Sequence, residues 1–206
     1  MAVRKARADD APAIQNLVNY YARKEVMLPL SLSDVYERLR DFFVYEEKGE
    51  IIGCGALHVV WEDLAEVRSL AVRPEARGRG IGRALFESCV REAPALGVRR
   101  VFALTFVPGF FQKLGLREVG KETLPHKVWS DCVRCPRFPN CDEVALVAEV
   151  DQDGVVVAAE GEPEAGRSRQ KAGSRKRSRV GGKHPENRSR IRGEPSDLTN
   201  RLRRVS

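Results

Sequence analysis

The order of apolar and polar residues along the chain predicts one short strand followed by two helices. Residues 3–7 alternate between apolar and charged side chains, which is the pattern of a strand. Residues 9–12 place two acids and a proline where a helix begins. Ser31 and Asp34 have the spacing of a capping box at the start of the second helix. The expected apolar stripes are Ile14, Leu17, Val18 and Tyr21 in the first helix and Val35, Leu39 and Phe42 in the second.

The pattern then changes to that of β-strands. Residues 42–46 and 51–61 are rich in β-branched and aromatic side chains, and residues 48–50 between them are typical of a hairpin turn. Residues 66–72 predict a third strand in succession. Three consecutive strands without a helix exclude a doubly wound parallel sheet and favour a mixed sheet with helices on both sides.

The remaining elements alternate between helix and strand. A glycine-rich turn at residues 77–82 opens a helix that we expect to end at Gly97. After it come a strand at 100–106, a short helix at 110–114 closed by Gly115, and strands at 116–119 and 144–150. The predicted order is therefore β-α-α-β-β-β-α-β-α-β-β, an α+β fold.

Charge divides the chain near residue 150. The net charge is +7, but residues 151–206 hold 14 basic and 8 acidic side chains, whereas residues 1–150 hold 22 and 21. All aromatic residues and all five cysteines also lie in residues 1–150. We therefore expect a globular domain over residues 1–150 and a disordered basic tail over residues 151–206, because the tail has too little apolar surface to bury.

Composition excludes several classes of protein. No apolar run approaches the roughly 20 residues of a membrane span, and the first residues lack the apolar stretch of a secretory signal. An odd number of cysteines in a domain of this length argues against a disulfide-stapled secreted module. These features predict a cytoplasmic protein with no membrane partner.

The strongest local signal is the glycine-rich turn that joins a strand to a helix. Glycines let a backbone approach a bulky anion, and the first amides of a helix are free to bind it. The turn is not a P-loop, since no Gly-Lys-Ser/Thr triplet follows. It is not a dinucleotide fingerprint either, since it follows the fourth strand rather than the first. The alternative is a turn with solvated arginines, but its place between strand and helix favours a pyrophosphate site.

This turn resembles the acetyl-CoA signature of the GCN5-related N-acetyltransferase (GNAT) family. The shared pattern, Val-x-Pro-x-x-Arg-x-x-Gly-x-Gly, is carried here by Val72, Pro74, Arg77, Gly80 and Gly82. Residues 110–116 are similar to a late segment of the same family, and the resemblance covers residues 3–150. It implies a three-layer fold whose seven-stranded mixed sheet is splayed between the fourth and fifth strands. Acetyl-CoA would lie in that gap, with its pantetheine paired to residues 69–72.

Within the family the chain resembles the short bacterial N-acetylglutamate synthases through residues 53–58, 66–72, 101–106 and 124–143. The resemblance implies transfer of an acetyl group from acetyl-CoA to the α-amino group of an amino acid, namely L-glutamate, in arginine biosynthesis. Two alternatives remain: an acetyltransferase for another amine, such as a different amino acid, a protein terminus or a small molecule, or a non-catalytic CoA-binding module tethered to nucleic acid by its tail.

The resemblance also implies roles for individual residues. Glu66 occupies the position of a general base, and the strand amides at Leu70 onward would stabilise the oxyanion. His58 is a second candidate base. Cys54 aligns with a cysteine that lines the amino-acid pocket in relatives. Apart from the resemblance, Lys24, Arg68 and Arg23 are candidate cations for a carboxylate of the substrate. The residues expected to bind the cofactor are Leu70, Ala71, Val72, Arg77, Gly78, Arg79, Gly80, Ile81, Gly82 and Arg83.

Three positions depart from the pattern of the glutamate-acetylating enzymes. Leu30 stands where those enzymes often carry an arginine, and Gly109 stands where they often carry a glutamate. A dicarboxylate needs charge-assisted partners, so the loss of an arginine puts glutamate itself in question. Phe111 replaces the tyrosine that serves as general acid in many members.

A cysteine cluster forms a second group of candidate ligands. Cys132, Cys135 and Cys141, with His126 upstream, offer three thiolates and an imidazole, which would complete a tetrahedral zinc site. Free loop cysteines, a redox-active pair or an iron–sulfur site are the alternatives.

The basic tail has two interpretations. It could contact nucleic-acid phosphates without sequence preference, but it has no aromatic residue for base stacking. A solvated extension is the favoured interpretation.

Overall fold

A computed structural model describes residues 2–125, 133 and 140–157. Its helices and strands follow the predicted order, with short 3₁₀ turns between several of them. Among these residues no helix combines the length and the apolarity needed to cross a membrane. The elements are β1 (Ala2–Lys5), α1 (Ala11–Ala22), α2 (Leu32–Glu37), β2 (Phe42–Glu47), β3 (Glu50–Trp61), β4 (Leu64–Val72), α3 (Ile81–Glu92), β5 (Arg100–Thr105), α4 (Pro108–Gln112), β6 (Arg117–Val119), β7 (Val144–Val150) and β8 (Val156–Val157).

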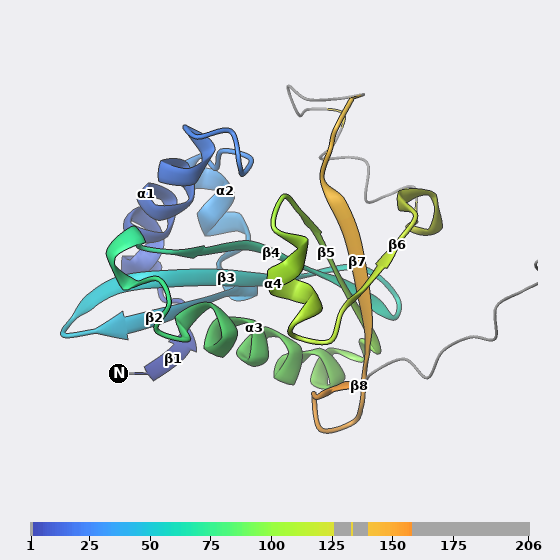
Figure 1. The fold of residues 1–206 in the computed structure, drawn as a ribbon. Helices are drawn as coiled ribbons and strands as arrows, with labels where there is room; N and C mark the ends of the chain where they lie inside the picture. Colours follow the sequence, from blue (N-terminus) through green and yellow to red (C-terminus); the bar gives the residue numbers. More distant parts are fainter. Residues whose placement is uncertain (1, 126–132, 134–139, 158–206) are drawn as a thin grey trace, which may run out of the picture. The chain divides into compact units, whose positions relative to one another are not determined.

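The strands form one mixed sheet in the order β1-β2-β3-β4-β5-β7-β6, with β8 against β7. Among the strands of the described residues, β4 and β5 are the one parallel pair, and their register covers three pairs, from Leu64–Arg100 to Glu66–Phe102. Beyond Glu66 the two strands separate, so that β3 and β4 run in a clearly different direction from β5 and β7 (Figure 1). The predicted mixed sheet and its splay between the fourth and fifth strands are therefore confirmed.

Helices cover both faces of the sheet (Figure 1). Strand β3 shows why, because successive side chains of a strand point to opposite faces. Leu57 belongs to the core beneath α3, together with Phe86 and Cys89. Ala56 belongs to the core beneath α1, together with Ile14. The long apolar run of β3 is thus explained by burial on both sides.

Local signals set the helix ends. The capping box is present as predicted: the Asp34 amide donates to Ser31 Oγ at 3.0 Å, and the Ser31 amide donates to Asp34 Oδ2 at 2.8 Å. Helix α3 ends earlier than expected, at Glu92, and a 3₁₀ turn continues to Gly97. The reason is Pro94, which has no N–H to donate to the preceding helical turn.

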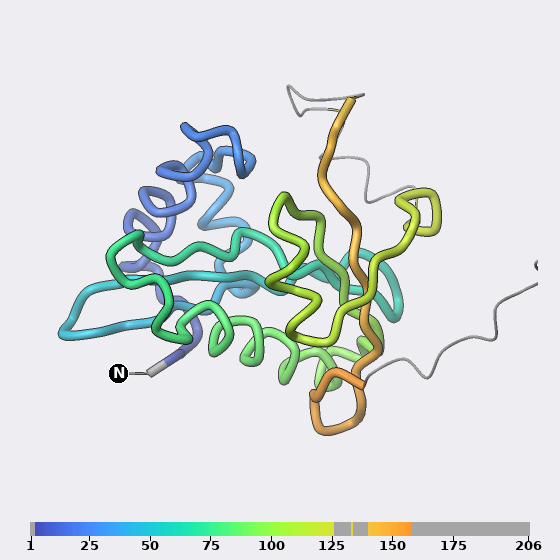
Figure 2. Tube along the Cα trace, in the orientation of Figure 1, coloured from blue at the N-terminus to red at the C-terminus, as the bar shows by residue number. Residues whose placement is uncertain are grey.

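The boundary predicted at residue 150 is too early. The chain turns after β7 and returns as β8, whose Val156 and Val157 pair with Val150 and Glu149. Figure 2 shows this hairpin at the end of β7. Val156 also packs against the main core. The sequence predicts that this segment belongs to the tail because its neighbours are acidic, but burial of its apolar side chain holds it against the domain. Residues 158–206, which hold the basic part of the tail, lie outside the described residues.

A buried ion pair joins β1 to the start of α1. Arg4 donates to both carboxylate oxygens of Asp10, at 2.7 and 3.0 Å, and to Glu46 at 2.8 Å. The Asp10 side chain is only 7% exposed. Its hydrogen bonds with Arg4 hold the pKa of the Asp10 carboxyl below its usual range.

We expect Asp10→Asn to lower the free energy of unfolding by about 1–3 kcal/mol at pH 7, because it removes a hydrogen-bonded charge and leaves Arg4 half satisfied. Asp10 has a lowered pKa, so its contribution is complete above the pKa of the unfolded chain and disappears as the pH falls through the folded value. The free energies of unfolding of the wild type and Asp10→Asn, measured with urea, should therefore differ at pH 7 and become equal in acid, below the pKa of Asp10 in the folded protein. Asp9→Asn, at the exposed neighbouring position, is the control; an equal loss in that variant would contradict the assignment.

Candidate active site

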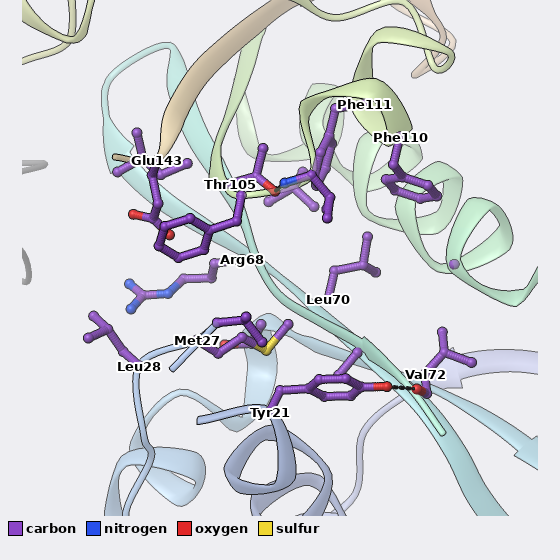
Figure 3. Close-up of a pocket in the computed structure, with 18 of the residues that line it drawn as sticks. Tyr21, Met27, Leu28, Arg68, Leu70, Val72, Thr105, Phe110, Phe111 and Glu143 are labelled. Atoms are coloured by element: carbon purple, nitrogen blue, oxygen red, sulfur yellow. Dashed lines mark hydrogen bonds between the residues drawn. The ribbon is translucent and has the colours of Figure 1, made fainter. Parts of the chain in front are cut away.

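The gap between β4 and β5 contains a cavity of about 1340 Å³. This exceeds the roughly 300–1,000 Å³ of a typical small-molecule site, so two substrates have room to bind together. The walls come from the end of α1 and the segment after it, from β4, from the turn before α3, from β5 and α4, from the turn after β6, and from the segment just before β7 (Figure 3).

One end of the cavity is the glycine-rich turn. Gly78 and Gly80 have φ of +76° and +79°, a region that other residues enter only at a cost. Gly80 caps α3, and the Ala84 amide is the one that donates to its carbonyl, at 3.0 Å. The amides before Ala84 have no acceptor within the helix and are available to an anion. Nothing lies within 4 Å of a Cβ built at Gly78 or Gly80.

The arginines of this turn divide into two groups. Arg77 and Arg83 line the cavity. Arg79, also predicted to bind the cofactor, does not: its guanidinium donates to both carboxylate oxygens of Glu47, at 2.6 and 3.1 Å. These hydrogen bonds lower the pKa of Glu47 and raise that of Arg79. Arg79 therefore ties the turn to β2 in this structure.

A bulge shapes β4 next to the cavity. The register with β3 shifts between Cys54 and Ala56, and Ser69 has φ of +52°. Gly55 faces the bulge, where an added Cβ would lie 2.8 Å from Leu70 Cδ1. A side chain at position 55 would therefore require the Leu70 side chain to move. The predicted cofactor strand, Leu70 to Val72, lines the cavity on the far side of this bulge.

The other end of the cavity gathers charged side chains from three parts of the chain. Glu66 and Arg68 of β4 form an ion pair of 3.5 Å, with side chains 16% and 14% exposed. Lys121 follows β6, and its ammonium donates to the Cys141 carbonyl at 2.8 Å. Glu143 stands just before β7, and the Cys141 thiol lies 3.5 Å from its Oε2. In Figure 3 the Arg68 guanidinium points into the space between Leu28 and Glu143.

Four residues proposed from the sequence for substrate binding or base catalysis do not line the cavity. Cys54 is fully buried, and burial raises the pKa of its thiol to about 12. Lys24 is exposed, and its ammonium lies 2.7 Å from the Tyr20 hydroxyl. His58, the second candidate base, pairs with Asp41 at 2.7 Å on the β3 surface. The structure thus gives no support to Cys54 or Lys24 as substrate ligands; Arg23, also exposed, is likewise absent from the lining.

The three departures from the family pattern have different surroundings. Leu30 is buried in the cavity wall, where Asn19 holds both its amide and its carbonyl at 2.9 Å. Phe111 is 5% exposed and packs against Phe86, and its phenyl ring lacks the hydroxyl proton with which a tyrosine could protonate a leaving group. At Gly109 an added Cβ would meet nothing within 4 Å. Of these three positions, Leu30 and Phe111 line the cavity and present apolar side chains to it, whereas Gly109 does not line it.

The predicted metal ligands fall mainly outside the described residues. His126, Cys132 and Cys135 are among the residues not described, and Cys141 alone can be placed. Within the described ranges no group of three or more His, Cys, Asp or Glu side chains could hold a metal. The zinc site therefore stays a prediction, as does contact of the tail with nucleic acid.

Sequence reasoning misses several cavity residues. Tyr21, Thr105, Lys121 and Glu143 all line the cavity. The helical spacing of Tyr21 predicts a core position. Thr105 and Glu143 lie in segments that carry the family resemblance, but these segments do not show which side chains face the cavity, and Lys121 has no motif around it. Their position depends on which strands lie beside the gap, and no local pattern carries that information.

The splayed sheet, the helix N-terminus open to an anion and the two-ended cavity define an acyltransferase that takes its acyl group from coenzyme A. A model of the acetyltransferase (GNAT) family matches residues 9–116, and the chain belongs to this family. The resemblance inferred from residues 72–82 is therefore confirmed, and acetyl-CoA is the cosubstrate.

The chain is similar to one curated amino-acid acetyltransferase in sequence and to two solved structures in fold. The amino-acid acetyltransferase of Mycobacterium tuberculosis is 41% identical over 135 residues, which cover 64% of this chain and 77% of that protein. Rv2747 of Mycobacterium tuberculosis, solved in complex with CoA, has a TM-score of 0.65 and 34% identity over 73% of this chain and all of that one. The N-acetylglutamate synthase of Neisseria gonorrhoeae, solved with coenzyme A and N-acetyl-glutamate, has a TM-score of 0.66 and 26% identity over 72% of this chain and 34% of that one.

We expect Gly80→Ala to weaken acetyl-CoA binding about 5- to 30-fold. The Cβ has space, but the left-handed conformation costs a non-glycine residue roughly 1–2 kcal/mol, and the turn relieves that strain by moving its amides away from the anion. Isothermal titration with acetyl-CoA measures the change. Gly109→Ala is the matched control, since its Cβ also enters open space but Gly109 has no positive φ. Equal affinities in the two variants would contradict the role of the turn.

Proposed function

We propose that the chain acetylates the α-amino group of L-glutamate, the first chemical step towards arginine. The observation that carries the proposal is the presence of two cations at the end of the cavity remote from the glycine turn. Arg68 reaches this end from β4 and Lys121 from the turn after β6. A dicarboxylic amino acid offers two carboxylates, and each needs a charge-assisted partner when it leaves water. The synthase of Neisseria gonorrhoeae, similar in fold, is described with N-acetyl-glutamate bound.

Glu66 is the proposed general base. It lines the cavity beside Arg68, and a carboxylate in this position accepts a proton from the substrate ammonium. The amine then attacks the carbonyl carbon of the thioester, and amides of β4 stabilise the oxyanion that forms. The carbon–sulfur bond breaks, the acetyl group stays on nitrogen, and the nitrogen releases its second proton to become the amide. CoA departs as its thiolate, which takes up a proton from water to give the free thiol. Phe111 does not supply that proton.

A panel of acceptors with a free-thiol readout tests the proposal. We expect glutamate to give the highest kcat/KM, with glutamine lower because an amide cannot satisfy the second cation. A higher kcat/KM for glutamine, another amino acid or a non-amino-acid amine would contradict glutamate as the acceptor. The apolar side chain of Leu30 would then be taken to contact that other acceptor. CoA binding without thiol release from any acceptor would favour a non-catalytic module.

The cellular setting follows from the same proposal. Arginine synthesis from glutamate would place the enzyme in the cytoplasm, as the cysteine content also predicts.

Deletion of residues 167–206 should leave the acceptor preference unchanged, because both cations and the glycine turn lie before residue 125.

A further inference from the structure

Tyr21 is an aromatic residue through which α1 contacts the cofactor strand. It lies near the end of α1, is 4% exposed and lines the cavity. Its hydroxyl donates to the Val72 carbonyl with an O···O distance of 2.5 Å, across 51 positions of sequence (Figure 3). Neither the catalytic base nor the acceptor cations account for this contact.

The Val72 carbonyl points into the gap rather than towards β3. The Arg73 amide donates to the Ile52 carbonyl at 2.8 Å, so Arg73 and Ile52 form a hydrogen-bonded pair of the antiparallel ladder. Val72 and Gly53 are the next pair and are therefore of the non-hydrogen-bonded kind. The N–H and C=O of Val72 face away from β3, where β4 has already separated from β5. Tyr21 thus binds a polar group that would otherwise have no partner in the sheet.

The Tyr21 ring has a second contact at the glycine turn. The guanidinium carbon of Arg77 lies 5.1 Å from the ring centroid, within the range of a cation–π interaction. Arg77 itself lines the cavity. One side chain therefore holds both the last peptide of β4 and the arginine that begins the turn.

We infer that Tyr21 is a positioning residue for acetyl-CoA. Its hydroxyl holds the Val72 peptide in the orientation that a ligand in the gap meets, and its ring holds Arg77 over the approach to the amides of α3. A carbonyl has two lone pairs, so the bond from Tyr21 leaves one for an N–H of the ligand. Tyr21 acts through Val72 and Arg77, and the inference does not depend on which amine is the acceptor.

The test separates the hydroxyl from the ring. Tyr21→Phe removes the hydrogen bond but keeps the surface under Arg77, and we expect the Kd and KM for acetyl-CoA to rise about 5- to 10-fold. Tyr21→Leu removes both contacts and should raise the Kd and KM for acetyl-CoA further than Tyr21→Phe does. The KM for the acceptor and kcat should each stay within about twofold in Tyr21→Phe, because the effect is confined to the cofactor side.

Tyr20→Phe is the matched control. Tyr20 neighbours Tyr21 in the same helix, but its hydroxyl meets Lys24 and it does not line the cavity. Isothermal titration with acetyl-CoA gives Kd without any acceptor, and thermal melting shows whether each variant is folded. An unchanged Kd in Tyr21→Phe, an equal change in Tyr20→Phe, or a shift confined to the acceptor KM would each overturn the inference.

Discussion

Glu66→Gln should lower kcat about 10²- to 10⁴-fold, the range typical of a lost general base. The amide keeps the size of the side chain and its ability to hydrogen-bond Arg68, but it cannot accept a proton from the ammonium of the acceptor. The KM for acetyl-CoA should stay unchanged, since the glycine turn is at the other end of the cavity. Steady-state kinetics with a thiol readout measures both quantities.

The pH dependence makes this prediction sharper. Without a base, the reaction depends on the small fraction of acceptor that is already deprotonated, so the Glu66→Gln rate should climb steadily as the pH rises towards the pKa of the amine. Glu118→Gln, at an exposed position of β6, is the control for the substitution itself. If His58→Gln lost as much activity as Glu66→Gln, the base would have to be reassigned, although His58 pairs with Asp41 outside the cavity.

Arg68→Gln should raise the KM for glutamate about 10- to 100-fold. A hydrogen bond to a charged group contributes roughly 1.5–3 kcal/mol, and Arg68 is 14% exposed, so water is a poor replacement. Arg68→Lys keeps the charge but loses the fork that binds a carboxylate in two places, and its KM should fall between those of the other two proteins. Kinetics at saturating acetyl-CoA isolates the acceptor.

Arg100→Gln is the matched control for Arg68. Arg100 forms an exposed ion pair with Asp63 at the start of β5, outside the cavity, and its loss should leave the KM for glutamate unchanged. A rise in the KM for acetyl-CoA rather than for glutamate in Arg68→Gln would move Arg68 from the acceptor to the cofactor. Unchanged kinetics in Arg68→Gln would leave Lys121 as the cation to examine.

A comparison of Lys24 with Lys121 shows which part of the acceptor site the sequence could not predict. Lys24 is a candidate substrate ligand in the sequence because it is a cation that could replace the arginine missing at Leu30. The structure shows it exposed and engaged with Tyr20. Lys121 has the same chemistry and no local motif, yet it lines the cavity. The difference lies in the path of the chain around the gap, which neither residue's neighbours in the sequence specify.

For Cys54, too, the sequence could not predict whether the side chain lines the cavity or lies in the core. Its apolar neighbours predict either a pocket wall or a core thiol, and both are consistent with a strand that is apolar on two faces. The structure places its sulfur 3.6 Å from the Ser69 carbonyl, beneath the bulge of β4 and away from the cavity. Only the pairing of β3 with β4 decides which side of the strand a residue occupies relative to the gap.

The order of the elements, the family and the cofactor turn all follow from the sequence alone. Each depends on residues close together in the chain: a capping box spans four positions, and the turn from Val72 to Gly82 spans eleven. The acceptor end and the contact of Tyr21 with Val72 depend instead on the folded chain. Those features join α1, β4, the turn after β6 and the segment before β7. They exist because β4 and β5 stay paired only as far as Glu66 and Phe102. Where two strands part is set by the packing of the whole sheet, so the residues that meet in the gap are settled only when the chain has folded.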